Sequence, residues 1–166
     1  MSSATSYSAI DYLLDKANIH DTVTKGVLYI DLLRWDDLER EVFTDDIRVD
    51  YTSLFGGEVV NVKSKDQSNR GKACLKGWRK RYSGLLIDLP QPGSVPPPKK
   101  VRVYANYLVT LVPKDGNQEL VQNGGRYLIE VSRITPSDGG NPWRMSSIKA
   151  DVIYFTSNKE FYDHEN

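Results

Sequence analysis

The second half of the chain holds three long stretches rich in β-branched and aromatic residues, and this feature restricts the fold more than any other. The stretches run over residues 101–112, 126–134 and 143–155. Residues 114–117 and 137–142 separate them and are dominated by Gly, Asp, Asn, Ser and Pro, which favour turns. The pattern predicts three successive antiparallel strands with short connections.

The first half of the chain predicts helices instead. Apolar residues recur at helical spacing in four segments, at residues 7–20, 23–33, 35–43 and 68–82. Ser8 is expected to cap the first helix, with Asp11 three positions later. Residues 47–51 alternate between apolar and polar side chains and predict a half-buried strand. Helices that precede an antiparallel sheet are typical of an α+β domain with the helices packed on one face of the sheet.

The chain length suits a single domain of 166 residues, with a core over about residues 8–156 and a polar tail over residues 157–166. Residues 90–98 are rich in proline and predict a loop inside this domain, because too little chain follows for a second core.

The composition excludes several classes of function. Lys plus Arg and Asp plus Glu both number 22, so there is no basic excess and we expect no nucleic-acid partner. One cysteine, Cys74, and two histidines argue against a Cys/His metal site, and we expect neither metal nor cofactor. The N-terminus is polar, and no apolar run approaches the roughly 20 residues that span a bilayer. We therefore expect a cytoplasmic protein without a membrane partner.

Four local strings resemble the SnoaL-like, nuclear transport factor 2-like superfamily, and they occur in the family's order. They are YIDLLRWDDL at residues 29–38, FTDDIRVDY at residues 43–51, GGRYLIEVSR at residues 124–133 and WRM at residues 143–145. The resemblance implies a cone-shaped α+β barrel, in which N-terminal helices pack on a curved, mostly antiparallel sheet around an apolar pocket. It also implies a homodimer, because related cones pair through the open face of the sheet.

Within this family, the resemblance to scytalone dehydratase implies two site residues. The helix aspartate of that enzyme falls on Asp31, and its strand tyrosine falls on Tyr51, while its second tyrosine falls on Ile30. Its two catalytic histidines have no counterpart, because the histidines here are His20, in the first predicted helix, and His164, in the tail. Isomerisation, rearrangement or cyclisation therefore fits this chain better than dehydration by a histidine relay.

Several polar residues are candidates for acid–base chemistry. Asp31 and Arg34 are three positions apart and predict an acid with an orienting cation on one helix face, or else an ion pair at the rim. Glu130 stands among apolar neighbours, and it would be a usable acid or base if it faced the pocket. In the strand over residues 101–112, either Tyr104 with Asn106 or Tyr107 faces inward, and the apolar neighbours favour Tyr107. Packing in the core is the alternative for each tyrosine, including Tyr51.

Phe55, Trp78 and Leu86 are expected to form walls of the pocket, with Tyr104 and Asn106 as further contacts to the substrate. Taken with these residues, the resemblance implies a cofactor-free enzyme of natural-product biosynthesis. It would isomerise, rearrange or cyclise a small hydrophobic polycyclic substrate with Asp31, Arg34, Tyr51, Tyr107 and Glu130. The alternatives are a dehydratase of the same fold and a non-catalytic binding or dimerisation module whose cone is filled by its own side chains.

Overall fold

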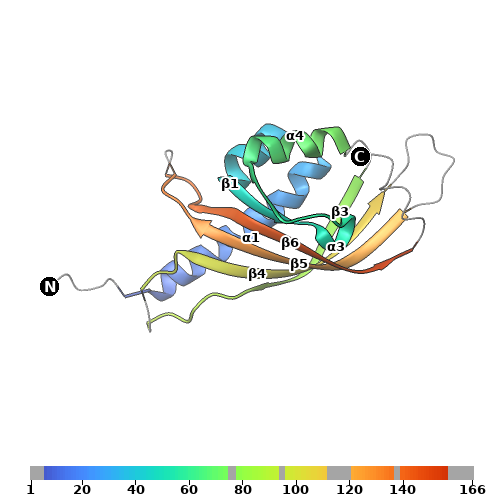
Figure 1. Cartoon of the computed structure of the whole chain (residues 1–166). Helices are drawn as coiled ribbons and strands as arrows, with labels where there is room; N and C mark the ends of the chain where they lie inside the picture. The colour runs from blue at the N-terminus through green and yellow to red at the C-terminus, as the bar shows by residue number, and fades with distance from the viewer. Residues whose placement is uncertain (1–5, 75–77, 94–95, 112–120, 137–138, 157–166) are drawn as a thin grey trace.

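The computed structural model describes residues 6–74, 78–93, 96–111, 121–136 and 139–156 (Figure 1). Six strands form one sheet in the order β2-β1-β6-β5-β4-β3. Their bounds are β1 Phe43–Asp50, β2 Val60–Lys63, β3 Trp78–Ile87, β4 Lys100–Leu111, β5 Val121–Arg133 and β6 Trp143–Phe155. The β1–β6 pair is parallel and the other pairs are antiparallel, which confirms the mostly antiparallel sheet.

One long helix, α1 (Ala9–Asp31), replaces the two that the sequence predicts over residues 7–20 and 23–33. Ser8 caps it as expected, and its side chain and that of Asp11 accept hydrogen bonds from each other's backbone N–H. The helix continues through Thr22 because this side chain is buried and donates to carbonyl oxygens of its own helix and of Trp143. A potential capping residue therefore serves as an internal anchor.

The next helical segment agrees with the prediction over residues 35–43. It comprises α2 (Trp35–Asp37) and a π-helical turn, η1 (Leu38–Val42), which leads directly into β1. Two short elements were not predicted, namely α3 (Thr52–Phe55) and the edge strand β2. Each has only four residues, too few for a periodic pattern to stand out.

The prediction of a helix over residues 68–82 is partly wrong. Helix α4 (Ser64–Cys74) occupies the first part, but the chain then forms β3 from Trp78 onward. Pairing with β4 decides the matter, because β3 lies in register with β4 along nearly its whole length and ladder hydrogen bonds satisfy the backbone groups on that side of β3. A bulge interrupts this register after Ser83, where Gly84 has a φ of +63°.

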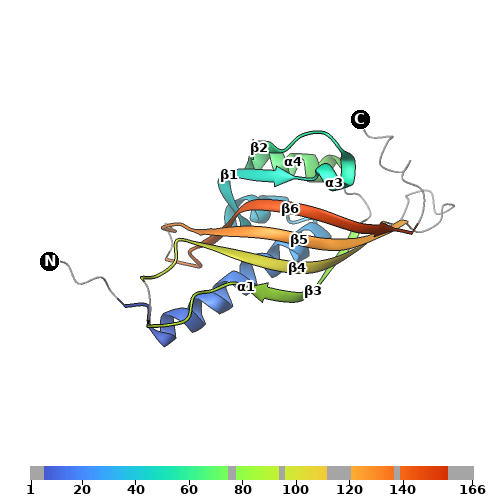
Figure 2. The ribbon, with the colours of Figure 1, turned by 60° about the horizontal axis from the view of Figure 1, so that its bottom comes forward.

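The sheet curves, and α1 packs against β3 and β6 on its concave side (Figure 2). The core lies between them and is formed by alternate residues of the long strands, including Val103, Ala105, Ile129, Val131 and Ala150. The opposite, convex face of the sheet carries charged strand residues, among them Arg102, Arg126 and Lys149. No helix in the described ranges is both long and apolar enough to cross a membrane.

Candidate active site

Three tyrosines from neighbouring strands meet on the concave face of the sheet. Tyr82 on β3 lies opposite Tyr107 on β4, and Tyr127 on β5 lies diagonally beside Tyr107. The ring centroids of Tyr107 and Tyr127 are 4.3 Å apart, and those of Tyr82 and Tyr127 are 5.6 Å apart in an edge-to-face arrangement. Tyr107 and Tyr127 are buried and Tyr82 is half-buried, so the rings form one aromatic floor.

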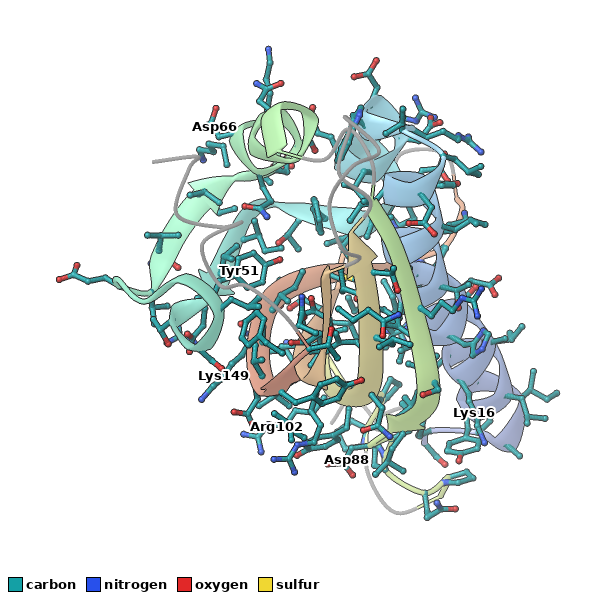
Figure 3. All side chains as sticks on the ribbon, turned by 90° about the vertical axis from the view of Figure 1, so that its right-hand side faces the viewer. Lys16, Tyr51, Asp66, Asp88, Arg102 and Lys149 are labelled. Atoms are coloured by element: carbon teal, nitrogen blue, oxygen red, sulfur yellow. The ribbon has the colours of Figure 1, made fainter. Side chains whose placement is uncertain are left out.

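Tyr51 faces this interior from the junction between β1 and α3, as the view into the open end of the curved sheet shows (Figure 3). Burial raises the pKa of Tyr51 to about 12. Burial, together with the nearby Tyr51, raises the pKa of Tyr82 well above its usual value. The two phenols are thus close enough for the charge of one to disfavour ionisation of the other.

Phenols with raised pKa values stay protonated at neutral pH. They can donate hydrogen bonds to a carbonyl or enolate oxygen, and they cannot act as bases there. Such bonds are stronger in a buried, low-dielectric setting than in water. The arrangement of Tyr51 and Tyr82 is therefore suited to stabilising negative charge on a substrate oxygen.

Asp31 is the last residue of α1 and is half-buried, directly after Ile30, which packs on the core. The helix ends there because Leu33 takes a φ of +57°. The prediction that Arg34 shares a helix face with Asp31 is wrong for this reason. Arg34 instead donates from Nε to Asp37 at 2.6 Å, and its guanidinium lies 4.4 Å from the ring centroid of Tyr29.

Of the two predicted orientations of β4, the structure has the one in which Tyr107 faces inward. Tyr107 is buried on the concave face, whereas Tyr104 and Asn106 are exposed on the convex face. They belong to the convex surface and not to the interior of the cone. Successive side chains of a strand point to opposite faces, so Tyr104 and Asn106 must lie on the face opposite to Tyr107.

Glu130 also lies on the convex face, so its predicted place in the pocket is wrong. Its carboxylate accepts a hydrogen bond from Lys100 Nζ at 2.8 Å. This bond, helped by Ser146, outweighs partial burial and lowers the pKa of Glu130, which stays a carboxylate at neutral pH. The concave position next to it belongs to Ile129, which is fully buried.

The predicted wall residues are only partly placed. Leu86 is 63% exposed and contributes to a groove outside the cone, so its assignment to the pocket is wrong. The side chains of Phe55 and Trp78 lie outside the described part of the structure. Sequence reasoning missed Tyr82 and Tyr127, although Tyr127 has the same strand parity as the apolar Ile129 and Val131.

A second buried polar cluster fixes α1 to the sheet near the N-terminus. The carboxylate of Asp15 accepts hydrogen bonds from the Tyr7 hydroxyl at 2.9 Å, from Trp143 Nε1 at 2.9 Å and from the Arg133 guanidinium. Burial, then the bond to Asp15, raises the pKa of Tyr7. All three partners donate to one carboxylate, so the cluster is a structural anchor. Among the described residues, no group of three or more His, Cys, Asp or Glu could hold a metal ion.

Known proteins with this architecture support the assignment of the fold. A protein from Kribbella flavida, Kfla4162, superposes with a TM-score of 0.76 at 21% identity, covering 92% of this chain and 99% of that one. The hexachlorocyclohexane dehydrochlorinase LinA-type3 from Novosphingobium barchaimii gives a TM-score of 0.68 at 18% identity, covering 90% and 93%. A proposed scytalone dehydratase from Novosphingobium aromaticivorans gives 0.68 at 13% identity, covering 89% of each chain.

No curated protein matches the sequence at a significant level. The family model described as a SnoaL-like domain, however, matches residues 11–149, which include β1 to β5, the first half of β6 and almost all of α1. The order of helices and strands, the curved sheet and this match agree, and the chain belongs to the SnoaL-like domain family.

Proposed function

We propose that the protein is a cofactor-independent enzyme that isomerises, rearranges or cyclises a small hydrophobic polycyclic substrate. The observation that carries this proposal is the convergence of Tyr51 with the aromatic floor of Tyr82, Tyr107 and Tyr127. The half-buried rings of Tyr51 and Tyr82 offer stacking surfaces to a polycyclic substrate. Their hydroxyls supply donors for an oxygen that gains charge during the reaction.

In the proposed mechanism Asp31 accepts a proton from a carbon next to a carbonyl group. The negative charge moves to the carbonyl oxygen, where Tyr51 and a floor tyrosine donate hydrogen bonds to the resulting enolate. Return of the proton at another carbon isomerises the substrate. Attack of the enolate carbon on a second carbonyl instead closes a ring, and the proton held by Asp31 passes to the alkoxide oxygen that this attack forms. Arg34 has no part in these steps, because it is held at the surface by Asp37.

Elimination is the second candidate, since two of the similar structures are named for a dehydrochlorinase and a proposed dehydratase. It begins with the same removal of a proton, but a leaving group departs instead of a ring closing. We also propose a homodimer that pairs through the convex face, which leaves the concave face free for substrate.

The first prediction concerns proton transfer. A panel of polycyclic aromatic ketones is incubated with the protein in deuterated water, and deuterium uptake and rearranged products are followed by mass spectrometry. Asp31→Asn and Tyr51→Phe should each lower the rate of uptake by about 10²- to 10⁴-fold, the usual contribution of a positioned acid or base.

The matched controls are Asp46→Asn, an exposed acid on β1, and Tyr154→Phe, an exposed tyrosine on β6. Both should retain the wild-type rate. Uptake that persists in the Asp31 and Tyr51 variants would show that the site is misplaced. Wild-type protein that bound these ketones without exchange or conversion would favour a non-catalytic binding module.

A further inference from the structure

An open, mostly apolar groove runs between α1 and β3 on the outside of the cone. Its volume is about 410 Å³. It is lined by Leu13, Lys16, Ala17 and His20 of α1 and by Leu85, Leu86 and Ile87 of β3. Leu13 and Leu86 are each 63% exposed, so the described part of the chain leaves the groove uncovered.

One wall of the groove is the edge of the sheet. β3 is one of the two edge strands, and β4 is its only partner among the described strands. The other side of β3 therefore presents backbone N–H and C=O groups with no strand beside them. An extended peptide can add to such an edge through main-chain hydrogen bonds, while a neighbouring groove receives alternate side chains. Helix α1, which lies beside β3, completes that groove here (Figure 3).

The polar part of the groove is basic. Lys16 and His20 are four positions apart and share a face of α1. The ammonium of Lys16 lies 6.0 Å from the ring centroid of Tyr12 and forms no ion pair with any described residue. His20 Nδ1 lies 3.7 Å from a carboxylate oxygen of Asp21.

We propose that this groove binds an extended acidic segment of a partner protein, which adds to the sheet as a further strand beside β3. Alternate apolar side chains of the segment contact Leu13, Ala17 and Leu86, and an acidic side chain meets Lys16. The unpaired edge fixes the extended conformation, the leucines favour apolar residues, and the lysine selects negative charge. This proposal is independent of the chemistry inside the cone.

The test uses a fluorescent eight-residue peptide of alternating valine and glutamate, with binding followed by fluorescence anisotropy. We expect saturable binding to the full chain and at least about tenfold weaker binding to Leu13→Glu and to Lys16→Glu. Leu28→Glu is the matched control, since Leu28 is 48% exposed on the same helix but does not line the groove. This variant should bind like the wild type.

A second peptide, with the same side chains but with every backbone amide N-methylated, tests strand addition directly. It should not bind, because methylation removes the donors that pair with β3. Equal binding of both peptides, or no binding of either, overturns the proposal. The proposal also fails if Leu13→Glu, but not Leu28→Glu, dissociates an oligomer of the peptide-free protein in sedimentation, because a second copy would then cover the groove.

Discussion

At the scale of single residues, Glu41 shows how donors from two elements hold one carboxylate in place. Its carboxylate accepts hydrogen bonds from Lys25 Nζ at 2.9 Å and the Tyr29 hydroxyl at 2.9 Å, both on α1, and from Arg40 at 3.0 Å. The bond from Lys25 is the largest cause that lowers the pKa of Glu41 to about 2. The network joins α1 to η1, the turn that leads into β1 and Tyr51.

The second prediction follows from this pKa. The folded state holds Glu41 ionised more strongly than the unfolded state does, so its contribution to stability is complete above the unfolded pKa of about 4.5 and is lost as the pH falls toward about 2. Glu41→Gln should lower the free energy of unfolding at pH 7 by about 1–3 kcal/mol. Urea unfolding at several pH values measures this difference.

The difference between wild type and Glu41→Gln should shrink steadily as the pH falls from 4.5 toward 2, because the wild-type carboxylate becomes protonated and neutral like the amide. Other acidic residues titrate in both proteins, so their effects on the free energy of unfolding cancel in the comparison. A difference that stays constant over this range would contradict a charge-dependent role for Glu41.

At the scale of elements, the irregular stretch of β5 beside Tyr107 requires a glycine. Gly125 pairs with Tyr107 on one side and with Val152 of β6 on the other, where the register of the β5–β6 pair shifts. A Cβ on Gly125 would lie 2.1 Å from the carbonyl oxygen of Asp151 and 2.9 Å from Val152 Cα. The backbone of β6 can approach β5 this closely only because Gly125 has no side chain.

The third prediction compares two neighbouring glycines. Gly125→Ala should destabilise the protein by about 1–3 kcal/mol or more, because backbone atoms must move apart. Gly124→Ala should cost less, since the obstacle there is the ring of Tyr154, a half-exposed side chain that can rotate away. Thermal unfolding of both variants measures the order. Equal losses of stability would show that the backbone of β6 moves aside as easily as the ring of Tyr154 rotates.

The agreement between sequence and structure differs from element to element. The three long C-terminal strands and the helical character of α1 follow from the sequence, because their patterns persist over many residues. The continuity of α1 through Thr22 does not, since it depends on a contact with Trp143. β3 does not, since Trp78 and Tyr82, four positions apart, fit a helical stripe as well as alternate positions of a strand. Pairing with β4, a contact distant in sequence, decides between them.

The same reasoning explains the outcome for the site. The concave position of Tyr107 could be predicted, because the apolar residues at alternate positions of β4 share its face. For β5 the prediction placed Glu130 in the pocket, but the concave position belongs to its neighbour Ile129. The position of Tyr82 on the concave face could not be predicted, because the pattern of residues 68–82 predicts a helix. A one-residue change of register moves a side chain to the other face, so the convergence of tyrosines depends on pairing that no single segment encodes.

At the scale of the whole molecule, the two faces of the sheet are suited to different tasks. The convex face has an exposed apolar centre, where Tyr104 is 42% and Leu128 is 37% exposed and the two lie opposite each other. Charged residues surround this centre, among them Arg102, Arg126 and Glu130. An apolar centre with a polar rim is typical of an interface between subunits.

The last prediction separates assembly from catalysis. If two copies pair through the convex face, Leu128→Asp places a charge at the centre of the interface and should weaken the dimer by about 100-fold or more. Sedimentation velocity at micromolar concentration should then show a monomer, whereas Leu28→Asp, on the exposed side of α1, should remain a dimer. Wild-type protein that is monomeric at high concentration would contradict the pairing. The monomeric variant should keep its rate of proton exchange, because Tyr51 and the aromatic floor lie on the opposite side of the sheet.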